Sequence, residues 1–310
     1  MPNRVDIAAF QKVMIVYNRN SGKQLFASML ARVNEVKKRL KQVIDPKSLE
    51  IVEIKSFEQV EGLAARICQE KYDWIIVAGG DGTLRAIIDV FAKHEHMPYV
   101  SVFPAGTVNL VAKELLMSND PAKWVKRVSK GIVSPVQLGK ANGHIFLTVA
   151  GIDSLVVDNV SELEKKLLSK LAYVWQGTEM MRKEFVYSNW RYKFQVRLDD
   201  EEEWYEASSV IVGKSRYYAG RYSLFNGASL CVPQLHVAIF TGDTRADFMR
   251  YAAVIAMEAL QLDKSIIIRH AQKIEIRCNV EDFAAELDGD AITSAPLQIE
   301  LHPVPINFLA

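Results

Sequence analysis

The stretch "WIIVAGGDGTLRAII", residues 74–88, runs from an apolar segment through a glycine-rich turn into a helix pattern. The apolar segment is typical of a buried strand, and an open α/β sheet binds ligands beyond the carboxyl ends of its strands. In the turn, GGDGT at residues 79–83, glycines let the backbone approach a ligand, and the N–H groups at the helix start attract phosphate. We therefore expect a phosphate-bearing ligand here, with Thr83 as a hydroxyl donor and Asp81 either reaching a divalent cation or organising the loop.

Strands alternate with helices on both sides of this stretch, up to about residue 130. Strand patterns occupy residues 12–17, 49–56, 72–78 and 98–104, and helix patterns occupy residues 25–40, 57–70 and 83–94. Several strands are continuously apolar, which is typical of a parallel sheet covered by helices on both faces. The first half of the chain is therefore predicted to be a doubly wound α/β domain.

The second half has a different pattern, with short strands joined by turns. Asn142-Gly143 between two strand patterns is a strong hairpin signal, and a second hairpin is expected around the acidic cluster at residues 199–203. Further short strands follow, and two helix patterns interrupt them, at roughly 160–183 and 244–262. This half is predicted to be an antiparallel β-sandwich.

The composition limits the kinds of partner. The 310 residues carry a net charge of +1, so bulk charge gives no reason to expect nucleic-acid binding. The three cysteines are widely spaced and form neither a disulfide framework nor a C-x-x-C metal site, which suits a reducing compartment. The first residues lack the features of a signal peptide, and no apolar run reaches the roughly 18 to 20 residues that span a bilayer. We expect a cytoplasmic protein, and peripheral contact with a membrane surface stays open.

Two other strand ends have the same kinds of residue as the GGDGT turn. The first strand runs into NRNSGK, residues 18–23, and the fourth runs into PAGTVN, residues 104–109. Small residues, hydroxyls and amides thus follow three of the four strands, where a doubly wound sheet places its ligand. A phosphate-rich ligand accounts for all three turns. The G-x-x-x-x-G-K-[ST] of a Walker A loop and the G-x-G-x-x-G of a Rossmann dinucleotide fold are both absent.

The motifs N-x-x-S-G, G-G-D-G-T and P-x-G-T-x-N, in this order and at this spacing, resemble the diacylglycerol kinase catalytic-domain family, which includes bacterial lipid kinases, sphingosine kinases and ceramide kinases. Four segments of the second half are also similar to the family: VAGIDS at 149–154, KLAYV at 170–174, YYAGRYSL at 217–224 and ELDGD at 286–290. The resemblance implies an α/β nucleotide-binding domain, like that of NAD kinases and diacylglycerol kinases, followed by a β-sandwich. The expected domains are 1–133, completed by a returning segment at 292–310, and a lipid-substrate domain at 134–291.

The resemblance also implies that the chain binds ATP, which arrives with Mg²⁺. The residues at the family's nucleotide-binding positions are Asn18, Ser21, Gly22, Ser56, Gly79, Gly80, Asp81, Gly82, Thr83, Arg85 and Thr107.

Phosphorylation of a lipid hydroxyl needs in-line attack, a metal on the phosphates and a carboxylate that accepts the proton. The resemblance implies that this base is Asp290, where the family has Glu. Asp is one methylene shorter, and a displacement of about 1 Å can cost on the order of a hundredfold in rate. Asp288 is expected to support the base or hold metal, and Asp81 and Asp288 are the candidates for reaching the nucleotide's Mg²⁺.

Some bacterial members of the family carry Asp-Gly shortly before an LDV segment as a structural metal site. The corresponding segment of this chain is CVPQLHV, residues 231–237. Val232 and Pro233 stand in place of Asp-Gly, and His236 stands in place of the later Asp. Because these carboxylates are missing, we do not expect that metal here.

Two basic segments are candidates for contact with lipid headgroups. The helix pattern at 160–183 has a leucine stripe that favours core packing, with an interfacial helix near the lipid entrance as the alternative. Lys214, Arg216 and Arg221 lie among tyrosines, and this cluster is expected to cover the sandwich.

Three functions are compatible with these motifs. The favoured one is an ATP-dependent lipid kinase acting on diacylglycerol or a related lipid alcohol, such as a sphingoid base. A NAD kinase would share GGDGT, but this chain lacks the N-x-G-x-x-G-F-L turn of those enzymes. A non-catalytic nucleotide- or lipid-binding homologue is the third, because Asp290 and the missing metal carboxylates depart from the family pattern. The lipid and the oligomeric state stay open.

Overall fold

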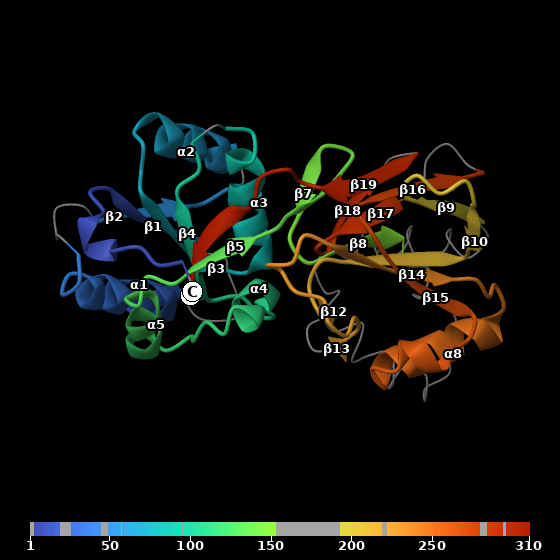
Figure 1. Ribbon diagram of the computed structural model, residues 1–310. Helices are drawn as coiled ribbons and strands as arrows, with labels where there is room; N and C mark the ends of the chain where they lie inside the picture. Colours follow the sequence, from blue (N-terminus) through green and yellow to red (C-terminus); the bar gives the residue numbers. More distant parts are fainter. Residues whose placement is uncertain are drawn as a thin grey trace. The chain divides into compact units, whose positions relative to one another are not determined.

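The computed structural model describes residues 3–18, 26–44, 49–56, 58–94, 96–152, 193–218, 222–279, 284–293 and 296–310. The chain folds into two compact units (Figure 1). The first, called the α/β unit below, comprises Met1–Gln137 and Pro303–Ala310, and the second, called the β unit, comprises Leu138–His302. This division confirms the expected fold class of an α/β domain joined to an antiparallel β domain.

The α/β unit is built on one six-stranded sheet with the order β2-β1-β3-β4-β20-β5. Neighbouring strands are parallel except for β5, which runs antiparallel to β20. The strands are β1 (Val13–Asn18), β2 (Leu49–Ile54), β3 (Trp74–Gly79), β4 (Tyr99–Pro104), β5 (Val133–Val136) and β20 (Ile306–Leu309). The helices are η1 (Ile7–Ala9), α1 (Phe26–Leu40), α2 (Glu58–Gln69), α3 (Asp81–Phe91), α4 (Leu110–Glu114) and α5 (Pro121–Val128).

Helices cover both faces of this sheet, as the apolar strands predicted. Helix α1 packs with α5, α2 packs with α3, and the two pairs lie on opposite faces (Figure 1). All six residues of β3 are buried, because a central strand between two helix layers has no solvent-facing side. The order β2-β1-β3 also means that the chain reverses direction across the sheet between β1 and β3, and such a switch point is where doubly wound sheets bind ligands.

The last strand, β20, inserts between β4 and β5 and completes the sheet. Ser101 Oγ accepts from the Trp74 indole N–H at 3.0 Å and donates to the Leu309 carbonyl at 2.8 Å, so one buried hydroxyl joins β3, β4 and β20. The structure places the start of the returning segment later than expected. It begins at residue 303 rather than 292, because β19 (Leu297–Leu301) pairs with β16 and β6 in the β unit. The first boundary moves from 133 to 137, because β5 pairs with β20.

The β unit consists of two six-stranded sheets, with the orders β10-β9-β16-β19-β6-β7 and β15-β14-β11-β8-β17-β18. Every pairing in them is antiparallel. The first sheet contains β6 (Gly139–Ala141), β7 (His144–Phe146), β9 (Phe194–Leu198), β10 (Tyr205–Ala207), β16 (Lys273–Cys278) and β19. The second contains β8 (Val149–Ile152), β11 (Ser209–Gly213), β14 (Leu235–Phe240), β15 (Ile266–Ala271), β17 (Ala284–Leu287) and β18 (Asp290–Thr293), and a separate ribbon pairs β12 (Tyr217–Tyr218) with β13 (Tyr222–Ser223).

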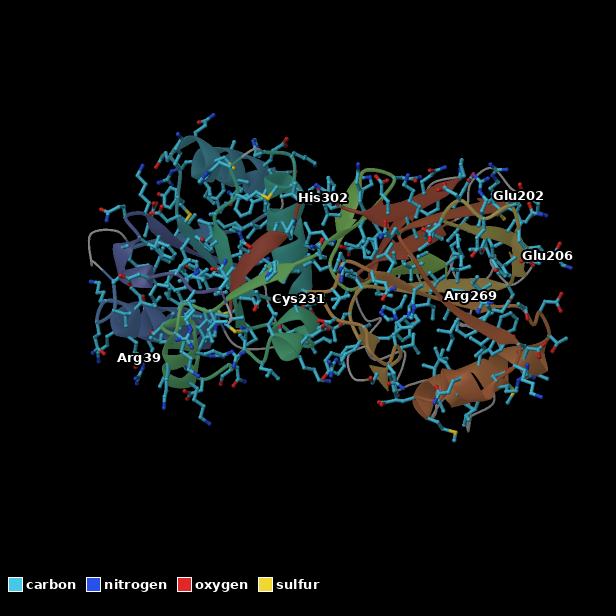
Figure 2. The ribbon with its side chains drawn as sticks, viewed as in Figure 1. Arg39, Glu202, Glu206, Cys231, Arg269 and His302 are labelled. Carbon is cyan, nitrogen blue, oxygen red and sulfur yellow. The ribbon has the colours of Figure 1, made fainter. Side chains whose placement is uncertain are left out.

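Both predicted hairpins are present. Asn142 and Gly143 have φ angles of 45° and 92°, the left-handed pair that a type I′ turn requires, and they join β6 to β7. β9 pairs with β10 across the acidic connection, where Glu202 and, on β10, Glu206 are exposed (Figure 2). The strand after β10 does not extend this hairpin, since β11 joins the other sheet.

A helix covers the outer face of the second sheet, which makes the β unit three layers deep. On β14, Val237 and Ile239 point into the sandwich core, while Ala238 and Phe240 point to a second core beneath α8 (Arg245–Ala256). This double burial explains why every residue of β14 except His236 is apolar. Helix α8 and the 3-10 turn η4 (Leu260–Leu262) match the helix expected at 244–262.

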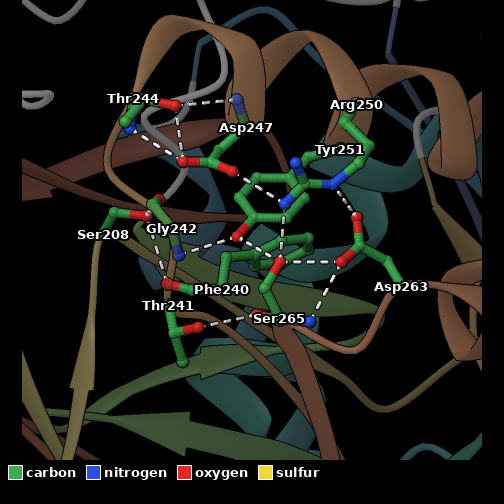
Figure 3. Close-up of polar contacts among 10 residues, drawn as sticks. All are labelled: Ser208, Phe240, Thr241, Gly242, Thr244, Asp247, Arg250, Tyr251, Asp263 and Ser265. Carbon is green, nitrogen blue, oxygen red and sulfur yellow. Dashed lines mark hydrogen bonds and ion pairs between the residues drawn. The ribbon is translucent and has the colours of Figure 1, made fainter.

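Polar contacts fix the start and the middle of α8 (Figure 3). Thr244 and Asp247 form a reciprocal capping box at its start. The Tyr251 hydroxyl accepts from the Gly242 amide at 2.7 Å, and Arg250 pairs with Asp263 near η4. These side chains therefore hold the helix to the segment that follows β14 and to the segment that precedes β15.

His236 on β14 makes the stability of the β unit depend on pH. The side chain is 4% exposed, and burial, with His270 and Lys214 nearby, lowers its pKa from 6.5 to about 4. Between pH 6.5 and 4, His236 is protonated in the unfolded chain but neutral in the folded chain. The free energy of unfolding therefore falls as the pH drops through this window. We expect a loss of about 2 kcal/mol between pH 7 and 4, measured by urea unfolding. His236→Gln should remove this component, and an unchanged pH profile in that variant would contradict the assignment.

Several predicted features lie outside the described residues: the helix at 160–183, most of the turn after β1 and Arg221. No helix of the described part of the chain combines the length and apolar character needed to cross a membrane. Of the basic cluster around β12, Tyr218 packs into the core beneath α8. Lys214 is fully buried rather than on the surface.

Candidate functional site

The carboxyl ends of β1 and β3 meet at the switch point of the α/β unit. Asn18, the last residue of β1, donates through Nδ2 to Thr83 Oγ1 in the first turn of α3 at 3.2 Å. Thr83 is 6% exposed. The two predicted nucleotide-binding residues are thus in direct contact, although 65 positions separate them in the sequence.

The GGDGT turn lies against the turn after β4. The Ala105 amide donates to the Gly79 carbonyl at 3.1 Å. A Cβ atom on Gly106 would lie 2.5 Å from the Gly80 Cα and 2.8 Å from Asn109 Oδ1. Backbone meets backbone here, so only glycine fits at position 106. The two glycine turns together form one surface at the N-terminus of α3, which we call the glycine cradle (residues 79–83 and 105–107).

Asn109 holds the second turn of the cradle in shape. Its backbone is left-handed, with φ 53°, and its side chain both accepts from the Gly106 amide at 2.9 Å and donates to the Gly106 carbonyl at 2.8 Å. The sequence motif P-x-G-T-x-N contained this residue, but we did not predict a role for it. Asn is one of the few residues that tolerate a left-handed backbone, and this was the available signal.

Asp81 organises the loop, which is one of its two expected roles. Its carboxylate accepts from the Leu110 amide at 2.9 Å and from the Val111 amide at 3.2 Å. These are the first N–H groups of α4, so the acidic side chain joins the start of α3 to the start of α4. The carboxylate stabilises the cradle by accepting from amides of buried residues that have no partner within the helix.

The other nucleotide candidates differ in their surroundings. A Cβ atom on Gly79 would lie 3.0 Å from the Thr83 Cβ, whereas one on Gly82 would have no heavy atom within 4 Å. Thr107 is exposed and Arg85 is half-buried. Ser56 is exposed and follows β2, which is on the far side of β1 from the cradle. Ser21 and Gly22 lie outside the described residues.

The two cradle glycines offer a matched pair of substitutions. Gly106→Ala should lower the stability of the α/β unit by about 2 kcal/mol, because the added methyl group overlaps the Gly80 backbone. Gly82→Ala should leave stability within about 0.5 kcal/mol of wild type. Gly82 belongs to α3, and a Cβ atom at this position has no heavy atom within 4 Å. Urea unfolding of the full chain tests both, and equal midpoints for the two variants would contradict this description of the cradle.

In the β unit, the late ELDGD segment forms the β17–β18 hairpin. Asp288 and Gly289 have φ angles of 52° and 94°, and Leu287 pairs directly with Asp290. The connection is therefore a two-residue Asp-Gly turn of type I′. Asp290 is exposed at the first position of β18, next to this turn.

Asp288 anchors this hairpin to the start of β8. Its carboxylate accepts from the amides of Leu147, Thr148 and Val149 at 2.6, 2.8 and 3.1 Å, and from the Thr148 hydroxyl at 2.6 Å. In return, the Asp288 amide donates to the Val149 carbonyl at 2.9 Å. We call this set of contacts the Asp288 clamp. Its geometry favours support of Asp290 over metal binding, because both carboxylate oxygens already accept hydrogen bonds.

Comparisons with known proteins match most of the chain. The family model described as the diacylglycerol kinase catalytic domain matches residues 12–141, and that of the YegS C-terminal NAD kinase beta sandwich-like domain matches residues 147–310. The chain belongs to the diacylglycerol kinase catalytic-domain family. The first match contains the glycine cradle, and the second contains the Asp288 clamp.

Individual relatives of this kinase family cover most of the chain. A diacylglycerol kinase of Bacillus subtilis (strain 168) is 26% identical over 284 residues, 90% of each chain. A diacylglycerol kinase of Staphylococcus saprophyticus is 28% identical over 223 residues, which are 71% of this chain and 70% of the relative. The crystal structure of a diacylglycerol kinase from Bacillus anthracis str. Sterne has a TM-score of 0.72 and 22% identity over 97% of both chains, which shows the shared fold.

The chemistry of the cradle suits the nucleotide of a kinase. It lies at a helix N-terminus, its glycines expose backbone, and no heavy atom lies within 4 Å of a Cβ atom built on Gly82. The described residues suit a metal ion held by the protein's own side chains less well than they suit a nucleotide. No group of three or more His, Cys, Asp or Glu residues is placed to hold an ion in the described ranges, and the carboxylates of Asp81 and Asp288 accept backbone amides. Mg²⁺ would therefore enter with the nucleotide phosphates rather than as a bound cofactor of the protein.

Proposed function

We propose that this protein transfers the γ-phosphate of ATP to a hydroxyl group of a lipid, either diacylglycerol or a related lipid alcohol such as a sphingoid base. The observation that carries the proposal is the glycine cradle at the switch point of a sheet in a chain of the diacylglycerol kinase family. The protein would be cytoplasmic and would meet its substrate at a membrane surface.

The cradle would bind the phosphates of ATP. The N–H groups at the start of α3 and the bare backbone of the glycines supply donors, and Thr83 and Asn18 lie beside them. Mg²⁺ would neutralise the charge that develops on the phosphates during transfer. In this proposal, Asp81 holds the start of α4 against the start of α3 by accepting from the Leu110 and Val111 amides.

Asp290 would accept the proton of the attacking hydroxyl. It is an exposed carboxylate on a short hairpin, and the Asp288 clamp restrains the backbone next to it. A general base must be within hydrogen-bond reach of the proton that it removes, so restraint of the hairpin contributes directly to catalysis. Asp288 acts in this scheme as a positioning residue.

Competing acceptors separate this proposal from its alternatives. The full chain is incubated with ATP and Mg²⁺ and is offered NAD, diacylglycerol or a sphingoid base, the lipids being in mixed micelles. Phosphorylation of one lipid is the expected result. Phosphorylation of NAD would indicate the NAD kinase alternative, and ATP binding without transfer to any acceptor would indicate the non-catalytic homologue that the shortened Asp290 side chain makes a candidate.

A further inference from the structure

Lys214 carries a positive charge into the interior of the β unit. It follows β11 directly, and the residue is 0% exposed. Its ammonium donates to the Ser229 carbonyl at 2.6 Å and to the Val232 carbonyl at 2.6 Å. An ammonium is costly to bury unless strong hydrogen bonds replace its water, and two charge-assisted bonds of this length provide such a replacement.

The two carbonyls belong to the connection that leads into β14. Within it the Val232 amide donates to the Ser229 carbonyl at 3.2 Å, and the Gln234 amide donates to the Val232 carbonyl at 2.8 Å. This tight turn directs two backbone oxygens at one point, where the ammonium sits. Convergent carbonyl oxygens are the usual surroundings of a bound cation.

The backbone of Lys214 contacts the same residue as the Asp288 clamp. The amides of Lys214 and Ser215 both donate to the Thr148 carbonyl, at 2.8 and 3.1 Å. Thr148 also donates to Asp288 through its amide and its hydroxyl. One continuous chain of contacts therefore joins the connection before β14 to the hairpin that carries Asp290.

A structural metal does not fit at this connection. The family resemblance associates such an ion with carboxylates here, and this chain has Val232, Pro233 and His236 instead. The carbonyls that could ligate an ion already accept from Lys214. His236 replaces a carboxylate and supplies no negative charge to balance an ion, and a divalent ion beside an ammonium would be repelled.

We infer that the Lys214 ammonium is a built-in structural cation, which replaces a metal ion in the β unit and holds the connection before β14 against β11. The inference does not depend on the proposed function. It requires that a divalent cation contribute nothing to the stability of the nucleotide-free protein.

The experiment is thermal unfolding of the nucleotide-free full chain, in EDTA and in millimolar Mg²⁺, followed by circular dichroism. Wild type should unfold at the same temperature in both conditions. Lys214→Met, which keeps most of the volume but removes the charge and both of its hydrogen bonds to the Ser229 and Val232 carbonyls, should lower the Tm by about 5–10 °C. The matched control Lys264→Met removes an exposed lysine and should change the Tm by less than about 2 °C.

Two results would overturn the inference. One is a wild-type Tm that rises by several degrees with Mg²⁺ and falls with EDTA, since a metal would then be part of the fold. The other is a Lys214→Met variant with the Tm of the Lys264→Met control. If Lys214→Met fails to fold, the comparison of wild type in EDTA and in Mg²⁺ still decides the question.

Discussion

Asp290→Asn is expected to lower kcat for lipid phosphorylation by about 100- to 10,000-fold, the range that a general base contributes. The amide cannot accept the proton of the attacking hydroxyl, while its size and the hairpin turn stay the same. ATP binding should be unchanged, because the nucleotide is assigned to the cradle in the α/β unit. Initial rates with labelled ATP and lipid micelles measure the first effect, and titration calorimetry with ATP measures the second.

Two further variants sharpen this test. Asp200→Asn alters an exposed carboxylate in the connection between β9 and β10 and should keep the wild-type rate. Asp290→Glu lengthens the side chain by one methylene and should retain measurable activity, although a shift of about 1 Å can lower the rate by on the order of a hundredfold. If Asp290→Asn keeps more than half of the wild-type rate, Asp290 is not the base.

Asp288→Asn should destabilise the β unit by about 3 kcal/mol, because one carboxylate accepts four hydrogen bonds in the clamp. Asn is the suitable replacement, since it also tolerates the left-handed backbone of residue 288. The rate of phosphorylation should fall as well, because the hairpin that carries Asp290 loses its anchor. Urea unfolding and initial rates measure the two effects.

The control for this variant is Thr148→Val, which removes only the hydroxyl of the clamp and should cost about 1 kcal/mol. An Asp288→Asn midpoint equal to that of wild type would contradict the clamp. If Asp288→Asn lowers the urea midpoint but leaves the rate of phosphorylation unchanged, the clamp stabilises the β unit but does not position Asp290 for catalysis.

The local patterns in the sequence predicted a large part of the fold. Continuous apolar strands indicated a doubly wound sheet, and Asn142-Gly143 indicated a type I′ hairpin, because turn chemistry and burial are properties of short segments. The glycines of residues 79–83 were read correctly as a strand-to-helix turn. Their contact with Gly106 was not predicted, although both turns were expected to face one phosphate-rich ligand.

Contacts between distant residues could not be predicted in the same way. The carboxylate of Asp288 binds amides about 140 positions earlier in the chain, and no periodicity encodes such a partner. Lys214 was expected among the residues that cover the sandwich, but it is buried. The sequence could not show this, because a lysine is buried or exposed according to the residues that the fold places around it. The boundary near residue 303 was missed for a similar reason, since β19 reads as a strand in either unit.

The central claim is that the protein is an ATP-dependent lipid kinase. The most direct test is transfer of the γ-phosphate from labelled ATP to a panel of lipid alcohols in mixed micelles, with wild type beside Asp290→Asn and Asp200→Asn. We expect labelled product from one lipid class with wild type and Asp200→Asn, and a loss of about 100-fold or more with Asp290→Asn. Tight ATP binding by wild type without labelled product from any lipid would contradict it.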